Sequence, residues 1–438
     1  MMSPWRRLFV LPAVVIAVAA GAVGAGAQVR CDDRENAYCT EIARLAQRPD
    51  VVQALRFIEQ QNETALRELI TLTEIPAPPF GEEVRAAAYA EMLRAAGADS
   101  VWTDSIGNVI ALRRGAGAAP RRTVAMAGHM DTVFPEGTDV TVRMRGDTLY
   151  APGIGDDTRG LVVVLHVLRA MARQEIRTEA DLLFIGTVGE EGLGDLRGVK
   201  HLFREGAPRI DSFIAVDGGS DGGITNGALG SRRYRVTFSG PGGHSWGAFG
   251  TGNPIHALGR AIMMFDTVAA TFTAAPGGRT SYNVGRIGGG TSVNSVPFEA
   301  WAEVDMRSVS QERLTAIDSI FRATMGRALA EQNTGIRRGE SLSVSVDLVG
   351  DRPSGVTEPG TPLLDRAMAA TLWLGDEPQL STSSTDANTP IALGIPAVTI
   401  GRGGVGGNTH SPDEWWIDRD SEKAVQRALL ILLAEAGG

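Results

Sequence analysis

The sequence predicts an α/β protein: a mostly parallel, mixed sheet with helices on both faces, into which a smaller α+β domain of ferredoxin-like type is inserted. Three observations lead to this fold class. Apolar runs typical of buried strands alternate with helical patterns up to residue 229, a strand-helix-strand-strand-helix-strand pattern occupies 230–349, and alternation of helix and strand resumes over 350–438. A chain of 438 residues also exceeds one ordinary hydrophobic core, so two domains are expected.

The first part of the main domain, residues 28–229, is expected to begin with helices near 48–73 and 81–96. The proline-rich sequence 75–79 separates them because proline ends a helix. The apolar segment 160–171 predicts a further, largely buried helix. Strands are expected at 99–103, 108–113, 123–128, 181–187 and 212–216.

The inserted domain, residues 230–349, begins where the pattern changes near Gly230. Its strands are expected at 233–238, 280–287, 298–307 and 341–346, and its helices at 254–270 and 311–332. This order resembles a split βαβ unit. The main domain then resumes over 350–438, with a buried strand at 395–400.

The N-terminus has the features of a secretory signal peptide. Two arginines precede an apolar stretch, and small residues end the segment 1–27, so cleavage after Ala27 is expected; an uncleaved anchor is the alternative. The mature protein is therefore expected in the periplasm or outside the cell. The only two cysteines, Cys31 and Cys39, follow this segment, and in an oxidising compartment a local disulfide is favoured over a metal pair.

Charge and hydropathy exclude two classes of partner. The formal net charge of -9 gives no general electrostatic reason to bind nucleic acid or an anionic membrane. After the N-terminal segment, no stretch is long and apolar enough to span a bilayer. A small soluble substrate fits this composition better.

Three short motifs carry most of the chemical information. They are His129-Met130-Asp131 after the apolar run 123–128, Asp156-Asp157 after 151–155, and Glu190-Glu191 after 182–189. Carboxylates and imidazoles that converge from the ends of several strands are the ligands that a two-metal hydrolase needs. The sequence therefore predicts a metal-dependent hydrolase.

Each motif also has a structural interpretation. His129 and Asp131 could form a hydrogen-bonded pair in a turn, or one could ligate a metal while the other orients it. Asp156 and Asp157 precede a helix, where carboxylates often serve only as caps. Adjacent acids after an apolar run, such as Glu190-Glu191, are costly unless a cation or shared proton relieves them, although a solvated loop would also explain them.

Two weaker candidates lie at similar positions. Asp217 ends the apolar strand 213–216, and His410 lies in a glycine-rich loop after the strand 395–400. Nearly all of these side chains fall at or just beyond the carboxyl ends of expected strands, which makes coincidence a poor explanation.

The ordered series of these residues resembles the co-catalytic zinc exopeptidases that include peptidase T, carnosinase, succinyl-diaminopimelate desuccinylase, glutamate carboxypeptidase and the aminoacylases. The resemblance runs from about Leu66 to the C-terminus. It rests on Gly128-His129-x-Asp131, Gly153-x-Gly155-Asp156-Asp157, Glu190-Glu191, Asp217, Gly243-His244 and His410. The family implies an α/β catalytic domain, an inserted lid and dimerisation domain, and a homodimer.

The resemblance also implies roles for individual residues. One metal ion would be held by His129, Asp156 and Asp217, and the other by Asp156, Glu191 and His410, with Asp156 bridging. Glu190 would be the general base, acting on a hydroxide held between two zinc ions, and Asp131 would orient His129. The family further implies a cis peptide bond after Asp156. Cobalt or manganese would use the same ligands as zinc.

Other residues resemble substrate-binding positions of the family. His244 corresponds to a histidine that reaches the substrate carbonyl oxygen, often across a dimer, although a turn histidine is the alternative. Asn294 and Arg307 resemble positions that grip substrate amide and carboxylate, and Arg307 has a plain ion pair as its alternative. The remaining histidines are expected only to pack or to form hydrogen bonds; they are His166, His201 and His256.

Two details bear on the branch of the family. Many relatives carry a lysine shortly after the bridging aspartate, whereas Thr158-Arg159-Gly160 follows here, so the charge near the substrate differs. An aspartate at 217 resembles peptidase T and carnosinase, while the desuccinylase and glutamate-releasing branches have glutamate. The expected function is hydrolysis of short peptides. An N-acyl-amino-acid amidohydrolase or carboxypeptidase is the first alternative, and a non-catalytic binding protein on the same scaffold is the remote one.

Overall fold

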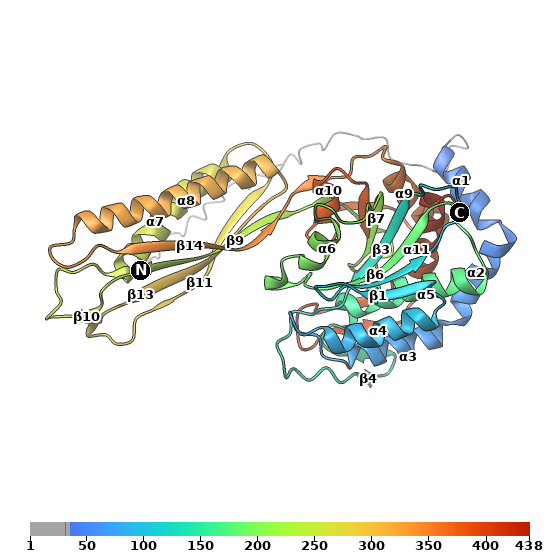
Figure 1. The fold of residues 1–438 in the computed structure, drawn as a ribbon, viewed down its shortest axis with the longest axis horizontal. Helices are drawn as coiled ribbons and strands as arrows, with labels where there is room; N and C mark the ends of the chain where they lie inside the picture. The colour runs from blue at the N-terminus through green and yellow to red at the C-terminus, as the bar shows by residue number, and fades with distance from the viewer. Residues whose placement is uncertain (1–30, 32–35) are drawn as a thin grey trace, which may run out of the picture.

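A computed structural model describes Cys31 and residues 36–438, which form a large α/β domain with an elongated lid domain projecting from one end (Figure 1). The expected signal peptide, residues 1–27, lies outside the described residues. Cys31 and Cys39 form a disulfide, as the sequence predicts. In the described part of the chain, no helix has the length and apolar character needed to cross a membrane.

The large domain is built on a nine-stranded mixed sheet. Its central strands β6, β3, β7 and β17 run parallel to one another, whereas both sides of the sheet carry antiparallel pairs. In spatial order the strands are β1 (Ser100–Thr103), β2 (Val109–Arg113), β6 (Asp181–Thr187), β3 (Thr123–His129), β7 (Ser212–Val216), β17 (Ala397–Ile400), β8 (Gly223–Ala228) and β15 (Gly355–Val356), and β16 (Gln379–Ser383) also pairs with β8. The expected mixed sheet is confirmed, and its central strands are parallel, while its other pairings are antiparallel except for β8 with β16.

Helices cover both faces of this sheet because alternate strand residues point to opposite sides. Val124 and Met126 pack into one apolar core, while Ala125 and Ala127 pack into another on the opposite face. The first core is covered by α1 (Ala37–Ala46), α2 (Pro49–Gln60), α3 (Asn62–Thr73), α4 (Glu83–Ala95), α5 (Gly160–Arg173), α9 (Pro362–Trp373) and α11 (Glu422–Glu435). The second is covered by α6 (Arg197–Leu202) and α10 (Asn388–Ala392).

One expected helix is wrong in detail. The segment 48–73 forms two helices, α2 and α3, because Gln61 leaves the helical region with φ and ψ of -95° and 6°. No glycine or proline stands at this break, so the sequence carries no strong signal for it.

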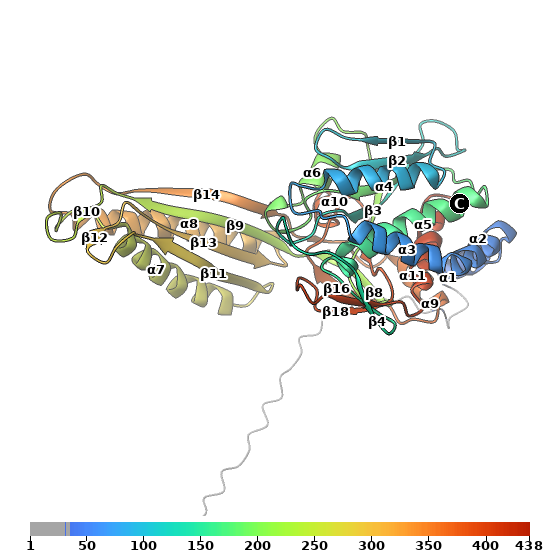
Figure 2. The same cartoon turned by 90° about the horizontal axis from the view of Figure 1, so that it is seen from below.

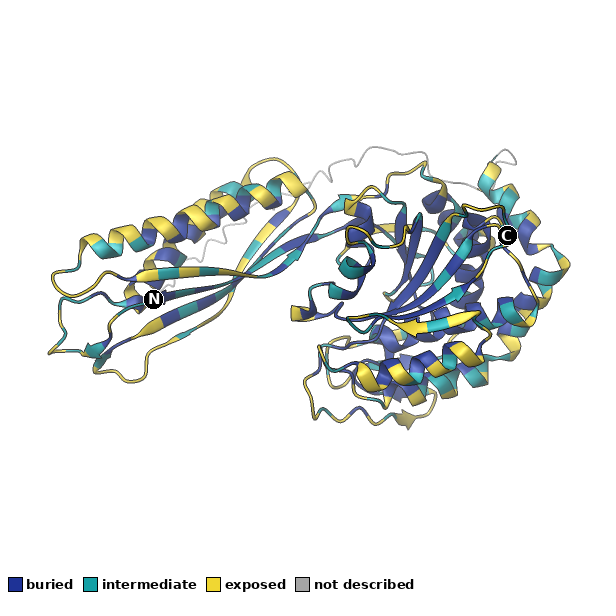
Figure 3. Ribbon diagram, viewed as in Figure 1, coloured by how far each residue is buried: buried dark blue, intermediate teal, exposed yellow. Residues whose placement is uncertain are grey.

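The lid domain has a four-stranded antiparallel sheet in the order β11 (Thr280–Gly289), β13 (Glu299–Ser308), β9 (Gly230–Ser239), β14 (Ser343–Arg352). Helices α7 (Pro254–Ala274) and α8 (Gln311–Thr334) pack on one face of it around an apolar core (Figures 1 and 2). Figure 3 shows the exposed outer surface of α8. The expected ferredoxin-like order of elements is observed.

The last lid strand is longer than the sequence indicates. A strand is expected at 341–346, but β14 continues to Arg352, which pairs with Ser231 of β9. The register shifts between Leu348 and Gly350, which interrupts the alternation that marks a strand in the sequence. The lid therefore joins the large domain through two paired strands, β9 and β14.

Two small sheets complete the fold. At the outer end of the lid, β10 (Gly243–His244) pairs with β12 (Ser295–Val296). In the large domain, a four-stranded sheet has the order β18 (Val405–Gly407), β19 (Trp415–Ile417), β5 (Thr148–Tyr150), β4 (Arg143–Arg145).

Candidate metal centre

The candidate ligands meet at the carboxyl edge of the central parallel strands. His129 is the last residue of β3, Glu190 and Glu191 follow β6, and Asp217 follows β7. Parallel strands end at the same edge of a sheet, which is the usual place for a ligand site in an α/β fold. His410 reaches this edge from the loop between β18 and β19.

Asp156 lies between two histidines. Its Oδ1 is 3.1 Å from Nε2 of His129, and its Oδ2 is 3.2 Å from Nε2 of His410. His410 Nε2 is also 2.8 Å from Oε1 of Glu191. One oxygen of the carboxylate therefore faces each imidazole, which is the arrangement that a bridging carboxylate requires.

Ligand atoms of His129, Asp156 and Glu191 all lie within 4.8 Å of one another, so these three side chains can hold a metal ion. The mixture of imidazole nitrogen and carboxylate oxygen fits zinc, and also cobalt or manganese. His410 stands beside this cluster, whereas Asp217 lies outside it.

Asp217 is held by a basic residue that sequence reasoning missed. The Arg402 guanidinium is buried, and its Nη1 lies 3.2 Å from Oδ1 of Asp217 and 3.8 Å from Oδ1 of Asp156. Burial raises the pKa of Asp217, and the neighbouring Asp156 carboxylate adds to this increase. The sequence held one signal for this residue: Arg402 is a charged residue within the glycine-rich sequence Gly401-Arg402-Gly403-Gly404.

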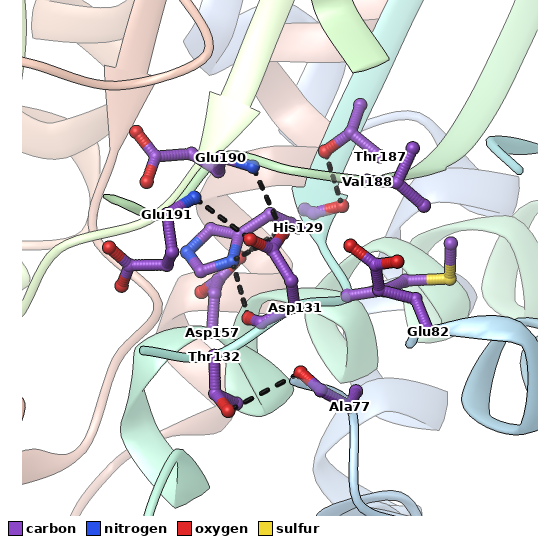
Figure 4. A network of polar contacts seen from close by, with 12 residues as sticks. Ala77, Glu82, His129, Asp131, Thr132, Asp157, Thr187, Val188, Glu190 and Glu191 are labelled. Atoms are coloured by element: carbon purple, nitrogen blue, oxygen red, sulfur yellow. Dashed lines mark hydrogen bonds and ion pairs between the residues drawn. The ribbon is translucent and has the colours of Figure 1, made fainter. Parts of the chain in front are cut away.

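Asp131 supports the centre in a different way from the expected one. Its backbone carbonyl is 2.9 Å from Nδ1 of His129, and Oδ1 of its carboxylate is farther away, at 3.7 Å from the same nitrogen. The Asp131 carboxylate instead accepts hydrogen bonds from the backbone N–H groups of Glu190, at 3.0 Å, and Glu191, at 2.8 Å (Figure 4). Asp131 therefore fixes the ring of His129 and the backbone of the glutamate pair together.

The peptide bond between Asp156 and Asp157 is cis, as the family resemblance implies. Asp157 is fully buried, and its Oδ2 accepts a hydrogen bond of 3.1 Å from the backbone N–H of His129. Burial raises the pKa of the Asp157 carboxyl well above its ordinary value. The two adjacent aspartates thus have different surroundings: Asp156 faces the imidazoles and Asp157 supports β3 from behind.

A second missed residue, Glu414, holds the loop that carries Asp156. Its carboxylate accepts hydrogen bonds from the backbone N–H groups of Gly153 at 2.8 Å, Gly155 at 2.9 Å and Asp156 at 3.0 Å. Gly155 has no room for a side chain, because a Cβ there would lie 2.9 Å from Oε1 of Glu414. The loop therefore needs both the glycine and the buried acid.

The charges of the site perturb its protonation. Burial acts to raise the pKa of Asp156, but hydrogen bonds to both histidines and the charge of Arg402 hold it well below its usual range. Hydrogen bonds to Asp156 and Glu191 raise the pKa of His410 to about 10. Burial acts to lower the pKa of His129, but the neighbouring aspartates raise it well above its ordinary value. A bound cation would take the place of these protons.

Glu190 is buried beside the cluster and faces a third missed residue, Arg352. Nη1 of Arg352 lies 3.0 Å from Oε1 of Glu190, and both side chains line a cavity of about 430 Å³. Burial raises the pKa of Glu190 well above its ordinary value, while the Arg352 charge opposes this increase. The cavity also contains Asp156, Glu191 and Asp217 in its wall, so it is the space available to a substrate.

Arg307 lines the same cavity from the lid. Its Nε is 2.7 Å from Oδ2 of Asp305, and Oδ1 of Asp305 is 3.0 Å from Nε of Arg233, which also lines the cavity. Both the expected substrate contact and the alternative ion pair are therefore compatible with its position.

His244 and Asn294 lie far from this cavity, at the outer end of the lid near β10 and β12 (Figures 1 and 2). They are close to each other, because the backbone N–H of Ser245 donates to the carbonyl of Asn294 at 2.8 Å. Nδ1 of His244 accepts from two backbone N–H groups of its own turn. Within one chain, these two residues do not join the site.

The other histidines form contacts outside the metal centre. Nε2 of His166 lies 2.8 Å from Oε2 of Glu68, and Nε2 of His201 lies 3.3 Å from Oγ of Ser105. His256 is exposed on α7. The prediction that these histidines pack or form hydrogen bonds is confirmed for His166 and His201, whereas the exposed His256 side chain forms no hydrogen bond with the described residues.

The fold and the site define a class: an α/β protein with a cluster of His, Asp and Glu at the carboxyl edge of its sheet, and with an inserted lid whose Arg233 and Arg307 line the adjoining cavity. The model of peptidase family M20/M25/M40 matches residues 125–434. The chain belongs to this family and is a hydrolase acting on peptide or amide bonds.

Individual relatives are distant in sequence. The chain is 26% identical to YqjE of Bacillus subtilis over 310 residues, covering 68% of this chain and 76% of YqjE. It is 25% identical to carboxypeptidase G2 of Pseudomonas sp. over 270 residues, which cover 60% of each chain. The match therefore spans less than two thirds of that carboxypeptidase.

Solved structures share the fold. Aminopeptidase PepT from Bacillus cereus matches with a TM-score of 0.66 and 23% identity, covering 85% of this chain and 98% of PepT. Human carnosine dipeptidase 1 matches with a TM-score of 0.65 and 14% identity, covering 88% and 99%. The YXEP protein of Bacillus subtilis, described as a dinuclear metal binding peptidase, matches with a TM-score of 0.62 and 16% identity, covering 86% and 99%.

Proposed function

We propose that this protein is an exported exopeptidase that hydrolyses the amide bond of short peptides with two zinc ions. The observation that carries the proposal is the position of Asp156, whose two oxygens face His129 and His410 at 3.1 and 3.2 Å. One ion would be held by His129, Asp156 and Asp217, and the other by Asp156, Glu191 and His410. Divalent ions bound there would acidify water and polarise the scissile carbonyl group.

Glu190 is the general base in this proposal. It adjoins Glu191 in the chain and lines the cavity, so its carboxylate can accept a proton from water at the centre and return it to the leaving amine. Asp131 holds the backbone of both glutamates, which keeps the base and the ligand in a fixed relation. Proton transfer by a positioned carboxylate contributes about 10²–10⁴-fold to rate.

His244 acts in trans in a homodimer. It lies outside the cavity of its own chain, and exposed apolar side chains follow it in the sequence: Trp246 is 87% exposed and Phe249 70%. Exposed apolar groups of this size favour a protein interface. In the proposed dimer the outer end of one lid reaches the cavity of the partner, where His244 would stabilise the developing oxyanion and Asn294 would bind the substrate.

Export agrees with the chemistry of the N-terminal region. The disulfide between Cys31 and Cys39 is a bond that persists in an oxidising compartment. Together with the signal-like sequence of residues 1–27, it supports a periplasmic or secreted enzyme.

An N-acyl-amino-acid amidohydrolase or carboxypeptidase is the alternative. Arg233 and Arg307 line the cavity on the lid side, and guanidinium groups there fit the free carboxylate of such a substrate. The likeness to carboxypeptidase G2 supports the same alternative. The aspartate at 217 favours the peptidase, as the family resemblance implies.

A substrate panel separates these functions. The mature protein, loaded with zinc, is incubated with dipeptides, tripeptides, N-acetyl amino acids and N-succinyl amino acids, each with and without chelator. The proposal predicts chelator-sensitive cleavage of peptides with a free amino group. Cleavage confined to N-acyl substrates would select the alternative, and no cleavage of any compound would reject both.

A further inference from the structure

The strand that returns from the lid to the large domain ends at the proposed general base. Arg352 is the last residue of β14, where it pairs with Ser231 of β9. Its side chain points out of the lid into the metal-centre cavity, and only 4% of that side chain is exposed. A guanidinium group is thus buried at the junction between the two domains.

Arg352 holds Glu190 at two points. Nη1 donates to the carboxylate oxygen Oε1 at 3.0 Å, and Nη2 donates to the backbone carbonyl of the same residue. Nη1 also donates to Oγ of Ser384 at 2.8 Å, which anchors the guanidinium to the large domain. Contacts to both the backbone and the carboxylate of one residue restrict its side-chain torsions.

The contact with Arg352 uses only one of the two carboxylate oxygens of Glu190. Oε1 is taken by Arg352, whereas Oε2 accepts no hydrogen bond from any of the described residues. Glu190 lines the cavity beside Glu191, so Oε2 is the oxygen left for a water molecule at the metal centre. We propose that Arg352 is a positioning residue that holds the Glu190 carboxylate in the orientation from which it accepts the proton of the attacking water. This inference rests on the proposed function of Glu190.

A second arginine, on β9, contacts the other end of the same loop. Arg233 of β9 donates through Nη1 to the backbone carbonyl of Gly192 at 2.7 Å. The paired strands β9 and β14 therefore form hydrogen bonds with both ends of the segment Glu190–Gly192. These two contacts connect the lid strands directly to the loop that carries the proposed base.

Arginine is suited to this role in a way that lysine is not. Its planar group donates to the carboxylate, the carbonyl and Ser384 at once, while a lysine ammonium is a point charge that cannot reach all three from one position. A buried ion pair is also a weak source of stability, because desolvation offsets its attraction. The pair is better explained by orientation than by stabilisation of the fold.

The test compares Arg352→Gln, Arg352→Lys and the control Arg232→Gln. Arg232 is the matched control because it lies on β9, the strand paired with β14. It pairs with Asp318 at 2.6 Å and Asp351 at 3.3 Å, and not with Glu190. We expect Arg352→Gln to lower kcat by about 100-fold with KM changed by less than about three-fold. Arg352→Lys should recover about ten-fold of that loss, and Arg232→Gln should stay within about three-fold of the wild type.

Two further measurements separate positioning from damage to the fold. Metal content by mass spectrometry should equal that of the wild type in both Arg352 variants. In a Glu190→Asp background, where the shortened acid no longer reaches the guanidinium, adding Arg352→Gln should lower kcat by less than about three-fold. Losses that multiply in the double variant, or equal losses for Arg352→Gln and Arg232→Gln, would overturn the inference. A wild type without peptidase activity would instead remove the proposed function.

Discussion

Glu414 offers a sharp test of how the metal centre is built, because it contacts no proposed substrate position. Its carboxylate accepts three backbone N–H groups from the loop that carries Asp156, at 2.8, 2.9 and 3.0 Å. Replacement by alanine removes both acceptor oxygens and therefore all three hydrogen bonds at once. The loop should then lose the geometry that directs the two oxygens of Asp156 at His129 and His410.

The size of the effect follows from the environment of the three donors. The N–H groups of Gly153 and Gly155 are buried with Glu414, whereas the contact with Asp156 is only partly buried. A buried donor without a partner costs about 1–3 kcal/mol, so two of them cost about 2–6 kcal/mol in the metal-free protein. Loss of an outer support of a ligand weakens metal affinity by about 10–100-fold.

The assay measures zinc affinity by competition with a chromophoric chelator, and stability by urea unfolding of metal-free protein. Asp413→Ala is the control, because this neighbouring acid is exposed and its side chain contacts none of the three loop donors. Glu414→Gln should fall between wild type and alanine, since its amide oxygen still accepts while its amide nitrogen meets a donor. Zinc affinity of Glu414→Ala equal to that of Asp413→Ala would refute the role given to this residue.

Three other variants test separate parts of the account. Asp156→Ala should lose metal at both positions, as measured by equilibrium dialysis, and two ions per chain in that variant would exclude the bridge. His244→Ala should lower kcat by about ten-fold or more with unchanged metal content, and an unchanged rate would leave it a turn residue. Hydrogen bonds from His166 and Arg169 outweigh burial and lower the pKa of Glu68 to about 2 from an ordinary 4.5. The pKa of Glu68 is lower in the folded than in the unfolded protein. The ionised Glu68 therefore stabilises the fold fully above pH 4.5, and this stabilisation is lost as the pH falls toward 2. Glu68→Gln should therefore be less stable than wild type by up to about 3 kcal/mol at pH 7, with the difference closing below pH 4.5; a difference in urea midpoint that is constant with pH would contradict this.

The sequence identified the edge of the sheet where the site lies, because polar side chains that follow buried strands are a local signal. His129 ends β3, and the glutamate pair follows β6, so an apolar run and a charged ending were visible together. The structure brings His129, Asp156 and Glu191 into one cluster and places His410 against it. Asp217, predicted from the same signal, lines the same cavity and lies 3.2 Å from Arg402, so its role as a ligand stays a prediction.

Arg352 and Glu414, which support the site, could not be predicted from local sequence patterns, since their partners are distant in the chain. Arg352 contacts a glutamate 162 positions away, and Glu414 contacts a loop about 260 positions away. No periodic or motif signal joins such pairs, and only the tertiary fold makes them neighbours. Asp131 shows a subtler limit: its importance was predicted, but which of its oxygens acts on His129 depends on a turn geometry that the sequence does not encode locally.

The lid domain was also predicted from local sequence patterns, except for the end of its last strand. The alternating strands and two long helices were plain in the sequence, whereas the shifted register near Leu348 concealed the last residues of β14. That concealed stretch ends at Arg352, the residue through which the lid contacts the base.

The most direct test of the account is reconstitution of the metal-free enzyme with zinc, with peptide hydrolysis and bound metal measured in the same samples. Wild type should regain activity as two ions bind, and Glu190→Ala should bind the same two ions with turnover lower by about 10³-fold or more. Wild-type hydrolysis that persists without metal, or a Glu190→Ala variant within about ten-fold of wild type, would contradict the assignment of a metal centre served by Glu190.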